Sequence, residues 1–270
     1  MDLDGAIDLH VHCAPDTRPR KTTAHELLRA AREAGMRGLL LKNHDTPTTA
    51  MAAVLAASEP DIHVFGGLVL NEAVGGFNPS AVDTAIRMGA KQIWMPTHCA
   101  AQERAFRGKA RSGLRAHDGA FFDSAIADIV KLVAEADIIL GSGHLAPRET
   151  LALVALARDA GCRKFLVTHP EIDFVQMPVA MQREIAARGV YFERCYARKG
   201  FALDWDGLAA SIRAVGVEST VLATDLGQPE NPDPVSGLWE VKRRFAERGF
   251  RESELRRMMC ENPARLLDLD

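Results

Sequence analysis

Residues 6–12 read AIDLHVH, an apolar run from Ala6 to Leu9 that leads directly into two histidines. His10 and His12 stand two residues apart, and side chains at positions i and i+2 of a strand point to the same face. We therefore expect both imidazoles to reach one common partner at the end of this strand.

Seven further apolar runs follow, each bounded by turn-forming residues. Most are apolar throughout and do not alternate with polar residues, which is typical of parallel strands covered on both faces. We expect strands at residues 6–9, 38–41, 63–70, 92–95, 138–140, 164–167, 190–192 and 220–223.

Helix signals fill the intervals between these strands. Thr23 and Glu26 form a capping-box pattern, and Asn78 with Pro79 supplies a cap and a first turn. Successive strands start about 24 to 46 residues apart, enough for one helical crossover each. Eight such units predict an α/β fold of the (β/α)8 TIM-barrel type, one domain spanning residues 1–270. An open doubly wound sheet is the alternative, but no GxGxxG follows the first strand.

The longest connection, residues 99–119, is a basic insertion after the fourth strand, on the face where barrels carry their active sites. Glu103 is its one acidic residue before Asp118. The basic residues are Arg104, Arg107, Lys109, Arg111 and Arg115.

Composition excludes several classes of function. The 270 residues are 47% hydrophobic and 26% charged, with a formal net charge of -3, which argues against disorder and against nucleic-acid binding. No apolar run is long enough for a membrane span, and the N-terminus is acidic where a signal peptide is basic. Five scattered cysteines without a CxxC motif agree with a reducing compartment. We expect a cytoplasmic protein.

Six of the nine histidines fall at the carboxyl ends of the expected strands. A barrel gathers these ends around one mouth, and neutral imidazole is the commonest zinc ligand. The pattern therefore predicts a metal site at the mouth. The residues are His10, His12, His44, His98, His144 and His169, with Glu193 and Asp225 closing the last two strands.

Several motifs together resemble the amidohydrolase superfamily of metal-dependent hydrolases. They are DLHVH (8–12), GSGH (141–144), VTHP (167–170), LATD (222–225) and ENPARLLDL (261–269), and they cover nearly the whole chain in order. The resemblance implies metal ligation by His10, His12, His144, His169 and Asp225. It also implies that Asp225 shuttles a proton from water to the leaving group.

Two features depart from that pattern. Many two-metal members carry a carboxylated lysine after strand four, where this chain has Pro96-Thr97-His98. The chain also partly resembles the PHP phosphoesterases, through LKNHDT (41–46), Glu72 and the His169-Pro170 pair. The final Asp-x-His of those enzymes is missing after Asp225, so this resemblance ranks second.

The expected cofactor is a divalent metal, Zn2+ first, with Mn2+ or Fe2+ as alternatives and one or two ions bound. Asp225, His98 and Glu193 are the predicted catalytic residues. Arginine suits carboxylate and phosphate groups, so the basic insertion is a candidate site for an anionic group of a small-molecule substrate. A solvated loop or a subunit contact is the alternative. The predicted substrate-binding residues are His44, Arg107, Arg111, Arg148 and Arg194.

The leading hypothesis is a hydrolase in which metal-activated water attacks an amide, lactone or ester. A PHP-like phosphoesterase and a non-catalytic metal- or ligand-binding barrel are the alternatives, and related barrels include decarboxylases and isomerases. No membrane or nucleic-acid partner is expected. A homo-oligomer is expected only because this is the commonest form of assembly among soluble proteins.

Overall fold

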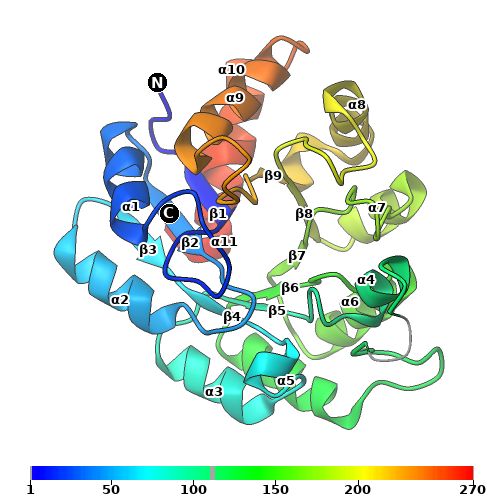
Figure 1. Ribbon diagram of the computed structural model, residues 1–270. Coiled ribbons are helices and arrows are strands. Elements are labelled where there is room, and N and C mark those ends of the chain that lie inside the picture. Colours follow the sequence, from blue (N-terminus) through cyan, green and yellow to red (C-terminus); the bar gives the residue numbers. More distant parts are fainter. Residues whose placement is uncertain (1, 110–112, 270) are drawn as a thin grey trace.

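The computed structural model describes residues 2–109 and 113–269. Within these ranges, parallel strands form a central ring and helices surround it (Figure 1). The strands are β1 (Ile7–Val11), β2 (Gly38–Leu41), β3 (His63–Phe65), β4 (Gly67–Val69), β5 (Gln92–Trp94), β6 (Ile139–Gly141), β7 (Phe165–Val167), β8 (Tyr191–Arg194) and β9 (Thr220–Leu222).

The expected strand at residues 63–70 is divided at Gly66 into β3, which pairs with β2, and β4, which pairs with β5. Thr48 causes the interruption. Its backbone N–H donates to the carbonyl of Gly67 at 3.0 Å, and its hydroxyl accepts from the Gly67 N–H at 2.9 Å. A Cβ at Gly66 would lie 2.6 Å from the Thr48 carbonyl carbon, so only glycine allows this approach.

The ring closes between the first and last strands. Just beyond β9, the Asp225 N–H donates to the carbonyl of His10, and the His12 N–H donates to the carbonyl of Leu226, both at 2.8 Å. Together with the continuous pairing from β4 to β9, this seam confirms the predicted α/β barrel.

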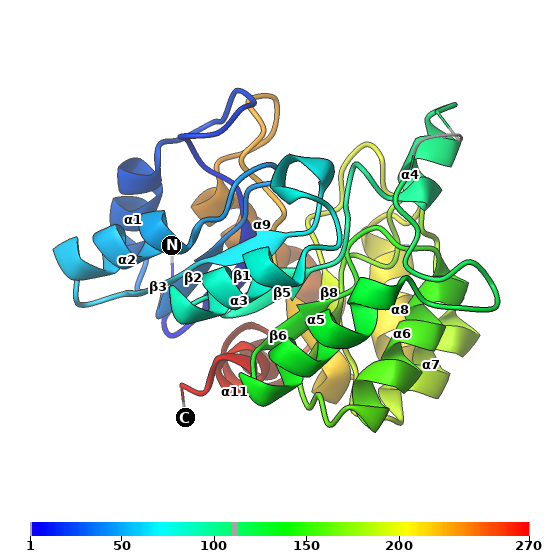
Figure 2. The same ribbon diagram turned by 90° about the horizontal axis from the view of Figure 1, so that it is seen from below.

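Apolar side chains fill the barrel interior and helix α11 (Asn262–Leu267) covers its lower end. Figure 2 shows α11 at one end of the molecule and α4 at the other. Fully burying one such side chain contributes roughly 1.5–3 kcal/mol. The interior cluster contains Ile7, Leu9, Leu40, Val69, Trp94, Ile139, Leu166 and Val221, packed against Ala264, Leu266 and Leu267.

Two helices begin at the predicted signals, and a third begins at an aspartate cap. Thr23 and Glu26 make the reciprocal capping box, Asn78 caps the helix that opens with Pro79, and Asp204 caps a later one. The helices are α1 (Ala24–Glu33), α2 (Thr49–Ser58), α3 (Pro79–Arg87), α4 (Ala101–Phe106), α5 (Ser124–Glu135), α6 (Pro147–Asp159), α7 (Val179–Ala186), α8 (Trp205–Val215), α9 (Pro234–Ala246) and α10 (Glu252–Arg256).

Short helical turns complete the described chain. They are η1 (Glu72–Val74), η3 (Val217–Ser219) and the π-helical turn η4 (Arg257–Glu261). In the ranges that the structure describes, no helix has the length and apolar character needed to cross a membrane.

Candidate metal centre

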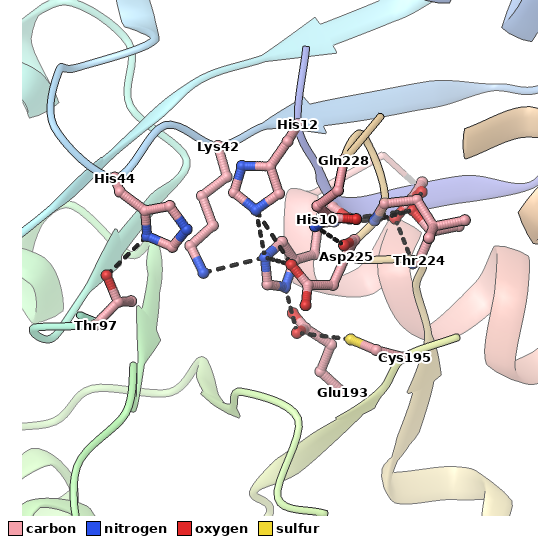
Figure 3. Close-up of polar contacts among 12 residues, drawn as sticks. His10, His12, Lys42, His44, Thr97, Glu193, Cys195, Thr224, Asp225 and Gln228 are labelled. Carbon is pink, nitrogen blue, oxygen red and sulfur yellow. Dashed lines mark hydrogen bonds and ion pairs between the residues drawn. The ribbon is translucent and has the colours of Figure 1, made fainter. Parts of the chain in front are cut away.

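Three side chains converge at the seam that closes the barrel (Figure 3). The Nε2 atoms of His10 and His12 lie 3.3 Å apart, and Asp225 Oδ1 lies 2.9 Å from the first and 3.1 Å from the second. All three residues are buried. The two histidines come from the end of β1 and Asp225 from the end of β9, so the barrel closure itself sets their spacing.

These distances fit a shared metal ion. Ligand atoms bound about 2.1 Å from one zinc lie roughly 3.0 Å apart at octahedral angles and roughly 3.4 Å apart at tetrahedral angles. The observed spacings of 2.9–3.3 Å lie close to that interval. Two imidazoles and one carboxylate also form a donor set typical of catalytic zinc sites. His10, His12 and Asp225 are therefore a candidate metal centre.

A carboxylate fixes the orientation of His10. Glu193 Oε1 lies 2.6 Å from His10 Nδ1, which leaves Nε2 facing the cluster. Cys195 donates to the same oxygen at 3.3 Å, and Asp8 accepts from the backbone N–H of His10 at 3.0 Å. Glu193 is fully buried behind His10. It was predicted to be catalytic, and its position suits a residue that orients a metal ligand.

His12 has a different partner on its outer nitrogen. Arg20 Nη2 lies 3.2 Å from His12 Nδ1 and is held by Asp16. Because guanidinium can only donate, this contact favours the tautomer with the His12 proton on Nε2, facing Asp225. Burial lowers the pKa of His12 to about 3, so the ring is neutral. Metal binding through Nε2 would therefore require the contact with Arg20 to open.

Asp225 is held from several sides. Its φ angle is +51°, an uncommon backbone conformation for a residue other than glycine, as often found at functional sites. Oδ2 accepts a short hydrogen bond from Arg198. Burial by itself raises the pKa of Asp225, but the charges of Arg198 and His10 outweigh it and hold that pKa well below its ordinary range. Asp225 is therefore ionised.

Lys42 completes the cluster, although it was not among the predicted site residues. It follows β2 directly, is 2% exposed, and places Nζ 3.1 Å from His10 Nε2. Across residues 2–109 and 113–269, no carboxylate lies within ion-pair distance of Nζ. Burial lowers the pKa of Lys42. A lysine placed directly after an apolar run was the one signal in the sequence that could have found it.

His44 and His98 lie on the side of β2 and β5. His44 Nδ1 is 2.8 Å from the hydroxyl of Thr97, and its ring stacks 5.0 Å from that of His12. Buried Asn71 donates to Thr97 Oγ1 at 2.6 Å and lies 3.2 Å from His98 Nδ1. These hydrogen bonds hold both imidazoles on one wall of the site.

The adjoining wall contains His144 and His169, which follow β6 and β7, the next strands after β5. Glu103, on α4, lies 2.5 Å from His144 Nδ1, and His144 and Arg107 together hold the pKa of Glu103 at about 2 against the effect of burial. His169 has a φ of +22°, and its Nδ1 is buried without a hydrogen-bond partner in the described part of the chain. Its ring lies 5.7 Å from that of His10. The basic insertion thus supplies a carboxylate to the site, which its composition had not indicated.

These walls enclose a cavity of about 200 Å3. Asp225 reaches its surface, whereas Glu193 does not. The cavity is lined by His44, His98, His144, His169, Glu103, Asp225, Arg18, Arg107, Arg198, Ile172, Phe174 and Gln228.

The predicted substrate-binding arginines differ in where they lie relative to the cavity. Arg107 lines the cavity, and Arg111 lies outside the described residues. Arg148 is exposed at the start of α6 and is not among the lining residues. The prediction for Arg194 was wrong. It is fully buried and paired with Glu171, so it has no surface to offer a substrate.

The fold and this cluster define an α/β barrel with a histidine–carboxylate centre at the carboxyl ends of its strands. The chain belongs to the family of unknown function DUF6282, whose model matches residues 5–193. No curated protein matches the sequence.

Solved structures share the fold over nearly the whole chain. An amidohydrolase from Pseudomonas aeruginosa is 11% identical with a TM-score of 0.71, and 98% of this chain covers 95% of that one. An amidohydrolase from Burkholderia multivorans with bound zinc is 16% identical with a TM-score of 0.65, covering 98% and 99%. An organophosphorus hydrolase from Deinococcus radiodurans is 14% identical with a TM-score of 0.62, covering 90% and 82%. These likenesses confirm the resemblance to the amidohydrolase superfamily at the level of the fold.

Proposed function

We propose that this protein is a metal-dependent hydrolase that cleaves an amide, lactone or ester of a small molecule. The observation that carries the proposal is the triangle of His10 Nε2, His12 Nε2 and Asp225 Oδ1, 2.9–3.3 Å on a side, beside a histidine-lined cavity. The zinc-containing structural neighbour supports Zn2+ as the ion.

His10, His12 and Asp225 would hold the ion, and His144 or His169 would contribute to it or to a second one. A bound divalent ion supplies Lewis acidity, which lowers the pKa of water and polarises a carbonyl oxygen. Glu193 keeps His10 in the orientation that presents Nε2. His44, fixed by its Thr97 contact, is placed to donate to a substrate oxygen. His98 lines the cavity, with Nδ1 facing Asn71 and Nε2 facing Asp45.

In this proposal Asp225 both holds the metal ion and acts as the general base. One oxygen faces the histidine pair, and the other is bonded to Arg198. While Arg198 stays in place the carboxylate is a weak base, so accepting a proton from water requires the guanidinium to turn away. Arg198 therefore controls when Asp225 can act as general base.

The phosphoesterase alternative has less support. Glu72, part of that resemblance, lies on η1 with its side chain 52% exposed and both oxygens bonded to Arg104. It is outside the three-residue cluster. A barrel that only held metal would leave no open position beside the ion, and the cavity next to the cluster argues against that. Turnover of a substrate distinguishes the enzyme from a ligand-binding barrel.

Metal content of the purified protein tests the proposal. We expect at least one ion per chain, lost in His10→Asn and kept in the matched control His25→Asn, whose side chain is exposed on α1. Both variants should show the unfolding cooperativity of the wild type. The metal-loaded protein is then assayed on lactones, esters, amides and phosphate esters. No bound metal in the wild type, or activity that is equal in His10→Asn, would overturn the proposal.

A further inference from the structure

A second, larger cavity of about 730 Å3 lies outside the first. The two share Arg18, His98, Glu103 and Arg107, so the outer cavity leads to the histidine-lined one. A substrate that occupies both would extend well beyond the group that reacts.

Positive charge is concentrated in the outer cavity. Four basic side chains line it, Arg18, Arg104, Arg107 and Lys109, against two carboxylates. The chain as a whole has a net charge of -3, so this excess does not reflect its composition.

Both carboxylates are already engaged. Glu72 accepts two hydrogen bonds from Arg104, at 2.8 and 2.7 Å. Glu103 accepts from Arg107 Nε at 2.5 Å and lies 2.5 Å from His144 Nδ1. Both carboxylates of the lining are therefore bound to other residues, and Arg18 has no carboxylate partner among the described residues.

Arg18 stands at the junction of the two cavities. Its Nη2 donates to His98 Nδ1 at 3.2 Å, while His98 Nε2 lies 3.4 Å from Asp45. The partner of the guanidinium is thus a ring nitrogen that carries no negative charge. A guanidinium has five N–H donors in a planar fork, so most of the donors of Arg18 remain for a ligand. Carboxylate and phosphate groups match that fork.

We propose that the outer cavity binds an anionic group of the substrate, a carboxylate or a phosphate, with Arg18 and Arg107 as its contacts. This inference rests on the proposed function. It assigns the substrate two parts: a scissile bond that reaches His10, His12 and Asp225, and an anionic end held at the entrance.

Calorimetric titration of the purified, metal-loaded protein tests this assignment. The ligands are inorganic phosphate, succinate and, as a neutral control, butane-1,4-diol. We expect binding of an anion but not of the diol, with a dissociation constant that rises about tenfold in Arg18→Gln, as for loss of one charge-assisted contact. The anion that binds more tightly identifies the chemistry. Arg148→Gln, an exposed arginine outside the lining, should bind like the wild type.

The same titration on His10→Asn separates this inference from the proposed function. Anion binding that persists in His10→Asn and weakens in Arg18→Gln places the anion at the arginines, whether or not the wild type holds a metal. Binding that is lost in His10→Asn and kept in Arg18→Gln would place it at the metal and overturn the inference. Absence of anion binding by the wild type, or unchanged affinity in an Arg18→Gln/Arg107→Gln double variant, would also overturn it.

Discussion

Replacing Lys42 with methionine should stabilise the metal-free protein. Lys42 is 2% exposed, and its ammonium group has a histidine nitrogen, not a carboxylate, at 3.1 Å. Methionine keeps most of the buried stem and removes the charge. The desolvation cost of a buried ion is several kcal/mol, and attraction to more distant carboxylates repays part of it. We expect a net gain of about 2 kcal/mol in the free energy of unfolding.

For a chain of this size, 1 kcal/mol shifts Tm by roughly 2–4 °C, so the expected increase is about 6 °C. The effect depends on pH. Because burial lowers the folded-state pKa of Lys42, the unfolded chain binds more protons between that pKa and the unfolded value of about 10.4. The contribution of Lys42 to wild-type stability therefore rises with pH in that window, and the advantage of Lys42→Met should be larger at pH 7 than at pH 9.5.

Thermal unfolding in excess EDTA at both pH values measures these differences. Lys164→Met is the matched control, because Lys164 is also largely buried but bonds to Asp268 at 2.5 Å and lies 3.1 Å from Asp137. It should lose about 1 kcal/mol. A Lys42→Met protein with a lower Tm than the wild type at pH 7 would refute the reasoning. It would show that other interactions fully offset the desolvation cost of the buried ammonium group.

Three further substitutions test other contacts. Glu193→Gln should weaken metal binding about 10–100-fold, because His10 loses its orienting carboxylate. Competition with a chelator measures the metal affinity, and an affinity equal to that of the wild type would contradict this prediction. Gly227→Ala should abolish metal binding, since its Cβ would lie 2.0 Å from the His12 carbonyl oxygen. A variant that still binds a full complement of metal would show that the backbone at the seam can shift to accommodate the methyl group. Glu171→Gln should cost about 3 kcal/mol in urea unfolding, because the buried arginine on β8 loses its charged partner, and a loss below about 1 kcal/mol would count against that pairing.

The barrel was predictable because each strand is buried on both faces. That burial requires apolar runs, and all eight predicted positions contain strands whose ends agree within about two residues. The division at Gly66 was not predictable. It results from Thr48 approaching the strand from 18 residues earlier, a tertiary contact that no local pattern encodes.

The candidate site was predictable where it consists of strand-end histidines and Asp225, whose positions follow from the barrel geometry. Lys42 was missed because lysine normally indicates a solvent-exposed position. Arg198 lies in a loop, where no spacing rule places a side chain. The error at Arg194 could have been avoided: Glu193 faces the barrel interior, so the next side chain on that strand faces outward, toward Glu171.

The seam between His10, His12 and Asp225 also has a consequence for biosynthesis. Two of the three residues of the proposed metal centre are synthesised near the start of the chain, and the third more than 200 residues later. A nascent chain on the ribosome holds an incomplete ligand set until its last barrel strand has emerged. The ion would then bind only after most of the chain has been synthesised. A product truncated before the last barrel strand would not retain it.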